Sequence, residues 1–326
     1  MNFQLSEDQQ ALQQGIRSFC NGRVTIDHLR GLEGRGFDPG LWRELAEMGV
    51  FGLRLPEEEG GVGLRSADAV LVFEELGRAL APGPLVWSHL AAGLVEGAAS
   101  GEAVVGGLDL ACAAPTPYVV EHFADLDVLL LLREEGVYRL DPRSLAAEPV
   151  AAPLDPLTPV HHLPALPQGE RIADAEAARA LRLAGTALVS GLLLGIAEAT
   201  QELAVDYAKK REQFGRVIGS FQAIKHILAD MFVRQEVARA AVYAAGATLD
   251  FPEVGDVERA VSGAKINAGE AAMKNSRACI QVHGGMGYTW EIPAHYYLKR
   301  TWVLESSFGT LEEHCESVAA RIESAA

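Results

Sequence analysis

Two segments organise this chain: Lys209–Gln222, K-K-R-E-Q-F-G-R-V-I-G-S-F-Q, and the distant Gln281–Gly287, Q-V-H-G-G-M-G. The first segment joins two long helical runs and gathers four cations in an acidic protein: Lys209, Lys210, Arg211 and Arg216. A helix beginning near Ser220 would present unpaired backbone N–H groups, and with the arginines these predict a site for a phosphate or pyrophosphate. The glycines of the second segment would let a backbone approach such a ligand closely.

The composition is that of an ordinary globular protein. The 326 residues are enough for two or three domains, and 49% of them are hydrophobic and 22% charged. The net charge of −16 argues against a nucleic-acid partner, because such partners require a broad cluster of Lys and Arg. A small anionic ligand is still compatible, provided that its site is locally basic.

Metal sites, disulfides and membrane segments are not predicted. The four cysteines form no C-x-x-C pair, and the pair His161–His162 has no acidic or cysteine partner at ligand spacing. The first ten residues lack a basic region followed by an apolar one, and no run of about eighteen uninterrupted apolar residues occurs. We therefore expect a cytoplasmic protein without a membrane association.

The order of expected elements divides the chain into three parts. Residues 1–105 are expected to be helical, with helices over 5–20, 39–48, 66–80 and 85–99. Residues 106–174 are expected to form a small β domain, with strands over 104–110, 128–132 and 137–140. Seven of the fifteen prolines lie between Pro142 and Pro167, which excludes a long helix there. Residues 175–326 return to long helices, from 175 to 210, from Ser220 onward, from Pro252 to the glycines at 284, over 294–306 and over 311–324, and predict an antiparallel bundle.

This order and these motifs resemble the flavin-dependent acyl-CoA dehydrogenase family. The resemblance extends along most of the chain and includes L-W-R-E-L-A-E-M-G-V-F-G-L-R-L-P-E-E-E-G-G-V-G-L at 41–64, F-E-E-L-G-R at 73–78, R-E-Q-F-G at 211–215 with F-Q at 221–222, and Q-V-H-G-G-M-G-Y-T at 281–289. It implies a mostly α fold with a small β domain. It also implies FAD as cofactor, an acyl-CoA substrate, and electron-transfer flavoprotein or a similar acceptor as partner.

The resemblance also implies a set of cofactor-binding residues. In the family, the matching residues contact FAD that is bound mainly by a neighbouring subunit; here they are Arg211, Phe214, Gln222, Gln281, Gly284 and Gly285. An arginine can pair with a pyrophosphate by charge-assisted hydrogen bonds, and glycines allow backbone contact without a Cβ clash. The structural alternative is that Phe214 and Phe221 are core residues, that Arg211 pairs with an internal carboxylate, and that the two glycines only end a helix.

The chain departs from the family at the catalytic base, a glutamate that removes the α-proton of the thioester while the β-hydrogen passes as hydride to flavin N5. The usual position, in an E-G-T triplet, is Phe308 here, and the second known position, on the central helix, is Gly185 with Thr186 beside it. Glu305 and Glu312 lie nearby in sequence, and solvated or structural roles are favoured for them. We therefore assign no catalytic residue.

The middle domain departs as well. Its usual A-x-T-E-P-x-x-G-S-D segment is not recognisable, and L-D-L-A-C-A-A-P at 108–115 is a degraded counterpart at best. The four tryptophans all lie outside this domain, so the strand tryptophan that covers the flavin is missing. A chain that keeps the donated half of an FAD site and loses its own half resembles the smaller, base-less subunit of the α2β2 acyl-CoA dehydrogenases of bacteria that degrade steroid side chains.

Three hypotheses follow from these features. In the first, the chain is a subunit that is catalytic only with a paralogous catalytic partner. In the second, it is a homomeric dehydrogenase with a relocated base. In the third, it is a scaffold that binds neither flavin nor thioester. The sequence identifies neither the acyl group nor the partner, and a steroid side-chain thioester is suggested by the subfamily resemblance alone.

Overall fold

A bundle of long helices runs through the whole molecule in the computed structural model, which describes residues 4–111 and 116–324. The bundle consists of α6 (Ala175–Lys210), α7 (Gln222–Asp250), α8 (Val257–His283) and α9 (Ala294–Ser306), and α10 (Leu311–Ser324) packs against α8. Asp174 caps the start of α6 and Asp256 the start of α8, each accepting a bond from a backbone N–H three residues on. The predicted bundle is confirmed.

The middle of α6 is the buried centre of this bundle. Within the described residues, α6 is the only helix that is long and apolar enough to cross a membrane. In its most apolar 18-residue stretch, 78% is buried inside the protein. Helix α4 (Ser66–Arg78) packs against it at backbone distance. A Cβ on Gly195 would lie 1.9 Å from the Glu74 carbonyl oxygen, and a Cβ on Gly77 would lie 2.1 Å from that of Leu192. Glycine is therefore required at this crossing.

The N-terminal part is helical, as predicted. It contains α1 (Glu7–Arg23), α2 (Ile26–Gly31), α3 (Pro39–Glu47), the 3₁₀ turn η1 (Glu57–Glu59), α4 and α5 (Leu85–Ala91). Ser6 caps α1 and forms a full capping box with Gln9. The predicted helix over 85–99 is wrong beyond Ala91, because Gly93 and Gly97 adopt left-handed conformations, with φ of +82° and +80°.

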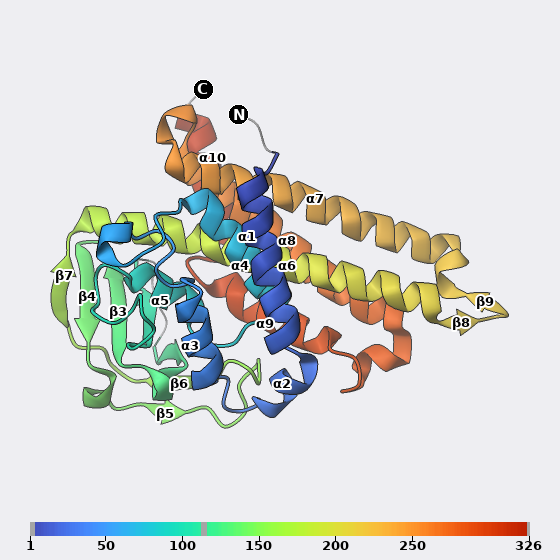
Figure 1. Cartoon of the computed structure of the whole chain (residues 1–326), viewed down its shortest axis with the longest axis horizontal. Helices are drawn as coiled ribbons and strands as arrows, with labels where there is room; N and C mark the ends of the chain where they lie inside the picture. Colours follow the sequence, from blue (N-terminus) through green and yellow to red (C-terminus); the bar gives the residue numbers. More distant parts are fainter. Residues whose placement is uncertain (1–3, 112–115, 325–326) are drawn as a thin grey trace.

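The β region lies at one end of the bundle and the hairpin β8–β9 at the other (Figure 1). One sheet has the order β1-β3-β4-β7, with β1 and β3 parallel and the other pairs antiparallel, and a second has the antiparallel order β2-β6-β5. The strands are β1 (Val105–Asp109), β2 (Tyr118–Glu121), β3 (Val128–Arg133), β4 (Gly136–Leu140), β5 (Glu148–Pro149), β6 (Val160–Leu163) and β7 (Glu170–Ala173), with the 3₁₀ turns η2 (Phe123–Asp125) and η3 (Pro142–Ser144).

The three predicted strands are confirmed as β1, β3 and β4. Strand β3 is apolar along its length and its central residues are fully buried, which is the pattern that sequence reasoning detects best. The short strands β2, β5, β6 and β7 were not specified. Residues 112–115 of the degraded segment at 108–115 lie outside the described residues. The division at 105 and 174 stays a prediction, although the element type changes between α5 and β1 and between β7 and α6.

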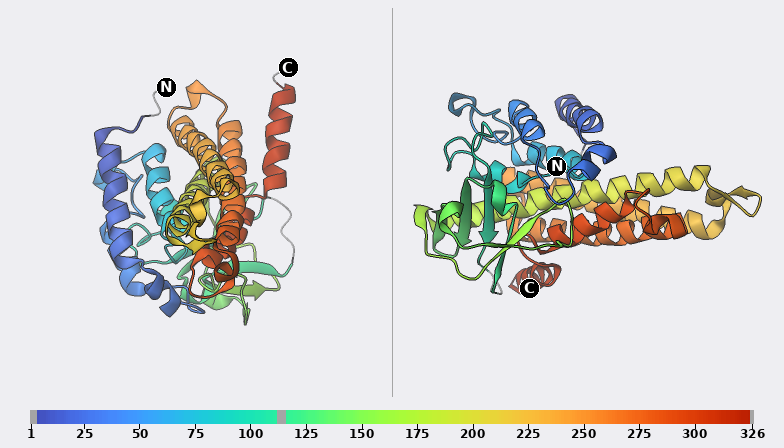
Figure 2. Two further views of the ribbon diagram at one scale, coloured as in Figure 1. Left: turned by 90° about the vertical axis from the view of Figure 1, so that its right-hand side faces the viewer. Right: turned by 90° about the horizontal axis from the view of Figure 1, so that it is seen from below.

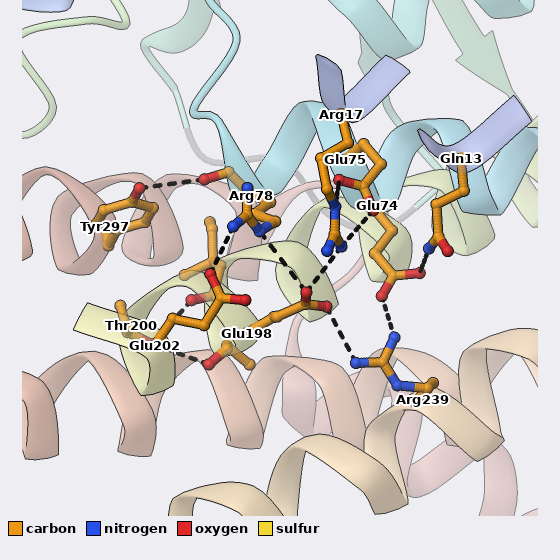
Figure 3. A network of polar contacts seen from close by, with 12 residues as sticks. Gln13, Arg17, Glu74, Glu75, Arg78, Glu198, Thr200, Glu202, Arg239 and Tyr297 are labelled. Carbon is orange, nitrogen blue, oxygen red and sulfur yellow. Dashed lines mark hydrogen bonds and ion pairs between the residues drawn. The ribbon is translucent and has the colours of Figure 1, made fainter. Parts of the chain in front are cut away.

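A network of buried charges joins the N-terminal helices to the bundle (Figure 3). Arg17 of α1 donates to Glu75 of α4 at 2.7 Å and to Glu198 of α6 at 2.8 Å. Arg239 of α7 contacts Glu74 and donates to Glu198 at 3.0 Å. Arg78 of α4 also lies 3.6 Å from Glu198, so Glu198 links four helices through three arginines. Figure 2 shows the N-terminal helices on one side of the bundle and α10 on the opposite side.

Candidate functional site

The first site element is the hairpin at the end of α6. Strands β8 (Glu212–Gln213) and β9 (Arg216–Val217) pair across a two-residue turn formed by Phe214 and Gly215, with φ of +54° and +75°. Two positive φ values at the centre of a two-residue loop are the requirement of a type I′ hairpin, which favours Asn or Gly over a bulky residue. Phe214 is 92% exposed, so the core alternative for this residue is wrong. A strained, exposed aromatic residue is a candidate for contact with another molecule.

The basic residues of the hairpin are exposed. The Arg211 backbone ends α6, and its side chain has no hydrogen bond or ion pair within residues 4–111 and 116–324, so pairing with an internal carboxylate is not observed. The Arg216 guanidinium lies 4.1 Å from the centre of the Phe221 ring. Helix α7 begins at Gln222, after the 3₁₀ turn η4 (Ile218–Ser220). The prediction of a start at Ser220 is therefore wrong by two residues, because the Ser220 hydroxyl donates to the Val217 carbonyl and does not cap α7.

The second element is the C-terminal end of α8, followed by the 3₁₀ turn η6 (Gly284–Tyr288). Gly284 has φ +59° and ψ −135°, a conformation open to glycine, and its N–H donates to the Gln281 carbonyl. The predicted helix stop is confirmed. No atom lies within 4 Å of a Cβ built on Gly284 or Gly285, so the described chain leaves open space beside this backbone.

The two elements meet at an open cavity of about 540 Å³. Its lining combines aromatic, aliphatic, glycine and two polar residues with one arginine: Tyr207, Arg211, Gln213, Phe214, Ile218, Phe221, Ile224, Val282, His283, Gly284, Gly285 and Met286. Four of the six sequence-predicted residues line it. Gln222 and Gln281 do not, although the adjacent Phe221 and Val282 do. An apolar, aromatic wall beside an unpaired arginine suits a planar ring that carries phosphate.

The two positions of the missing base lie together, far from this cavity. A Cβ on Gly185 would lie 2.4 Å from Cε1 and 2.5 Å from Cζ of Phe308, so the ring fills the space above Gly185. Phe308 is buried and stacks on Trp87, with ring centroids 4.7 Å apart. An aromatic cluster therefore occupies the place where a carboxylate would be expected.

The loop that carries Phe308 is fixed by two buried side chains. The Lys265 ammonium donates to the carbonyls of Ser307 at 2.6 Å, Gly309 at 2.8 Å and Glu305 at 3.2 Å, and burial lowers its pKa to about 7. His314 Nε2 donates to the Phe308 carbonyl at 3.0 Å. These bonds hold Phe308 at a φ of +55°.

A small cavity of about 50 Å³ adjoins Phe308, between α4, α5, α6 and α9. One side is apolar, and the other carries Glu121, His122 and Arg300, which sequence reasoning did not single out. Burial raises the pKa of Glu121 to about 7 and lowers that of His122 to about 3. Arg300 donates to Asp155 at 2.5 Å. These three residues lie far apart in the sequence, and no motif or periodic pattern indicates that they come together in the fold.

The two glutamates considered near the base position have other environments. The Glu305 backbone carbonyl accepts from Lys265, and Glu312 is exposed in the first turn of α10. Glu313, their neighbour, accepts from the Thr310 N–H at 2.7 Å.

Comparison with known protein families finds two matches. Residues 6–102 match the acyl-CoA dehydrogenase N-terminal domain, and residues 178–323 match the acyl-CoA dehydrogenase C-terminal domain.

Two curated relatives cover most of the chain. The acyl-CoA dehydrogenase IpdE2 of Mycobacterium tuberculosis is 36% identical over 82% of this chain and 81% of its own length. The IpdE2 protein of Mycolicibacterium smegmatis is 31% identical over 98% and 100%.

Two solved structures share the fold. The Tcur3481-Tcur3483 steroid ACAD has a TM-score of 0.85 at 24% identity, with 98% of each chain covered. The ChsE4-ChsE5 complex of Mycobacterium tuberculosis has a TM-score of 0.85 at 23% identity, with 99% of each chain covered.

Proposed function

Because the chain belongs to the acyl-CoA dehydrogenase family, whose cofactor is FAD, we propose that it is the base-less subunit of a heteromeric acyl-CoA dehydrogenase. It contributes contacts to FAD from across an interface, while a paralogous subunit in an α2β2 complex supplies the glutamate and most of the flavin site. The complex introduces an α,β double bond into an acyl-CoA thioester, in the cytoplasm.

The observation that carries this proposal is the packing of Phe308 onto Gly185. Both positions at which the family places its glutamate are apolar here, and the Phe308 ring fills the space beside Gly185. A carboxylate at either position would be buried against aromatic rings without a charged partner, which costs several kcal/mol. Neither family position therefore holds a carboxylate or leaves space for one, which supports a base supplied by another chain.

The length of α6 supports a contribution across an interface. The cavity at Arg211 and the position of Gly185 are separated by roughly 40 Å of helix, at a rise of about 1.5 Å per residue. One dinucleotide cannot bind at Arg211 and also present its flavin at Gly185 of the same chain. The FAD bound at the cavity must therefore react at an acyl site that belongs to another chain.

The residues at the cavity have defined tasks in this proposal. Arg211 pairs with the pyrophosphate, Phe214 packs against the dinucleotide, and Gly284 and Gly285 admit it to backbone contact. Gln222 and Gln281, each adjacent in sequence to a lining residue, are the proposed hydrogen-bonding groups. FAD held by these residues would supply the acceptor for the β-hydrogen, and a glutamate of the partner subunit would take the α-proton.

The substrate and acceptor are proposed from relatives. Two solved structures with this fold are named as a steroid ACAD and as a ChsE4-ChsE5 complex, which supports a bulky steroid side-chain thioester and a heteromeric assembly. An electron-transfer flavoprotein is named among structures with the same fold and is the proposed electron acceptor.

A homomeric enzyme with a relocated base is the second candidate. Glu121 favours it, because its carboxyl lies in the same cavity as Phe308 and its raised pKa of about 7 suits a general base. The small volume of that cavity, about 50 Å³, argues against it, since no acyl chain fits there without movement of Phe308.

The test is to purify the chain alone and together with its paralogous partner, and to measure the flavin band and the reduction of ferrocenium with acyl-CoA. The proposal requires flavin and turnover in the co-purified pair alone. Turnover by the single chain that is lost in Glu121→Gln would establish the homomeric candidate instead. A pair that forms without flavin would indicate a scaffold.

Arg211→Ala tests the contribution of the cavity within the pair. Loss of one charge-assisted interaction should weaken FAD binding roughly 10- to 100-fold, with unfolding of the bundle unchanged. Arg143→Ala, which removes an exposed arginine at the opposite end of the molecule, is the matched control and should retain full flavin content.

A further inference from the structure

A separate cavity lies between the loop after α3, helix α5 and the second turn of α6. Its volume is about 160 Å³, and an apolar protein cavity of roughly 150 Å³ holds one benzene molecule. It shares no described lining residue with the cavity at Arg211 or with the cavity at Phe308. The described residues that line it are apolar except for an arginine and a histidine, and none of them is acidic: Phe51, Arg54, Leu55, His89, Leu90, Ala92 and Leu181.

The bond made by His89 Nδ1 fixes the tautomer of this histidine. Nδ1 lies 3.0 Å from the Val50 carbonyl oxygen. A carbonyl can only accept, so Nδ1 carries the proton, and Nε2 of the neutral ring is then an acceptor. Burial, and to a lesser degree the charge of Arg54, lower the pKa of His89 to about 4, so the ring is neutral at pH 7.

His89 Nε2 reaches the cavity. The residue is buried, with 4% of its surface exposed. Within residues 4–111 and 116–324, Nε2 has no hydrogen-bond partner, and it is not among the fully enclosed atoms that lack one. Since the ring lines this cavity, the small accessible area of Nε2 faces it. The wall therefore presents one side-chain acceptor that requires an O–H or N–H donor.

Arg54 supplies a positive charge at the mouth of the cavity. The residue is exposed, and its side chain has no hydrogen bond or ion pair in the part of the chain that the structure describes. Asp250 is the carboxylate whose charge acts on it, but the Asp250 oxygens accept from the backbone N–H groups of Ser66 at 2.8 Å and Ala67 at 2.9 Å. The Arg54 guanidinium is therefore free to pair with an anion.

These groups together define the chemistry of a ligand. A guanidinium matches a carboxylate in a bidentate pair. The acceptor Nε2 of His89 requires a donor, and a hydroxyl group suits it better than an ammonium group, because no acidic residue among the described lining would compensate a second positive charge. The apolar walls take a short aliphatic chain.

We propose that this cavity binds a small aliphatic hydroxycarboxylic acid of about six carbons, a size that matches its volume. The carboxylate pairs with Arg54, the hydroxyl donates to His89 Nε2, and the chain packs against Phe51 and Leu90. The site lies outside the proposed FAD contribution and does not depend on it. Its occupant contacts α5 and α6, the two helices that carry Trp87 and Gly185.

The experiment titrates the full-length wild-type chain with three compounds and follows binding by ligand-observed NMR. The probe is 3-hydroxyhexanoate; hexanoate lacks only its hydroxyl, and hexane-1,3-diol keeps the hydroxyl and lacks the carboxylate. The probe should bind roughly 3- to 10-fold more tightly than hexanoate, the effect of one neutral hydrogen bond. It should bind roughly 10-fold more tightly than the diol, because the pair with an exposed arginine is partly hydrated.

Three variants assign these preferences to residues. Arg54→Met, which keeps the aliphatic stem, should lower the affinity for the probe to that for the diol and leave the affinity for the diol unchanged. Arg65→Met is the matched control, because Arg65 is also exposed, packs on Phe251 and does not line the cavity, and it should change none of the three affinities. His89→Phe should remove the preference for the probe over hexanoate.

Three results would overturn the proposal. Equal affinities of the wild-type chain for the probe and for hexanoate would show that His89 does not read a hydroxyl. Equal weakening by Arg54→Met and Arg65→Met would show that the anion meets only the general charge of this surface. Absence of binding at millimolar probe would refute the site itself. The comparison of the three compounds on the wild-type chain needs no variant to fold.

Discussion

Replacement of Gly185 by alanine should destabilise the protein through its contact with Phe308. The new methyl group would lie 2.4 Å and 2.5 Å from two ring carbons, well inside van der Waals contact. The ring cannot move freely, because it stacks on Trp87 and its loop is bonded to Lys265. Overpacking of this kind costs about 1–3 kcal/mol. Since alanine favours a helix over glycine by about 1 kcal/mol, the net loss should be about 0–2 kcal/mol.

Gly15→Ala is the matched control for the helix propensity. Gly15 lies on the exposed face of α1, and no atom comes within 4 Å of a Cβ built there. This change should stabilise the protein by about 0.5–1 kcal/mol, because propensity acts without a clash. The difference between the two glycine variants isolates the contact with Phe308.

A double-mutant cycle with Phe308→Leu completes the test. Leucine lacks the two closest ring atoms, so Gly185→Ala should become neutral or stabilising in its presence. The coupling energy between the two sites should be at least about 1 kcal/mol, above the usual additivity error of roughly 0.3–0.5 kcal/mol. Urea unfolding followed by circular dichroism measures each variant. If Gly185→Ala stabilises the protein as much as Gly15→Ala does, or if the double variant is additive, Phe308 does not fill the site at Gly185.

Three further changes test other parts of the structure. Gly195→Ala should cost about 3 kcal/mol or more in urea unfolding, because its Cβ would lie 1.9 Å from the Glu74 carbonyl oxygen, and a neutral result would mean that α4 and α6 do not cross at backbone distance. Arg239→Met should cost about 3–5 kcal/mol, because Glu74 and Glu198 would lose a buried partner, and simultaneous replacement of both glutamates by glutamine should recover most of that loss. The pKa of His89 falls from 6.5 to about 4 on folding, so the unfolded chain binds more protons between these values and the free energy of unfolding should fall by up to about 3 kcal/mol as the pH is lowered through them. His89→Gln should flatten this dependence, and an unchanged slope would assign the acid sensitivity to other groups.

The sequence predicted the elements whose pattern is periodic and strong. Helices α6 and α8 have capping aspartates and clear ends, and β3 is a continuous apolar run. The helix over 85–99 failed because helical periodicity continued past two glycines whose left-handed conformations depend on tertiary packing. The short strands of the second sheet have two to four residues, too few for a period to be detected.

The candidate site was predictable in its residues and not in its geometry. The motifs at 211–222 and 281–287 identified four residues that line one cavity, because the motif positions are local in sequence. The packing of Phe308 against Gly185 joins residues from α6 and from the loop after α9, and a contact between distant segments leaves no periodic signal. The cluster of Glu121, His122 and Arg300 was missed for the same reason.

The length of helix α6 sets how the hairpin end of the molecule is rotated relative to the β region. Each residue of an α-helix turns the side chain by about 100° and advances it by about 1.5 Å. Deletion of a single residue between Gly185 and Arg211 would therefore rotate the cavity by more than a quarter turn relative to the β region, while changing its distance little. In an assembly whose subunits clasp one cofactor, that rotation would misplace every contact at once. The helix can thus vary in sequence among related proteins far more easily than it can vary in length.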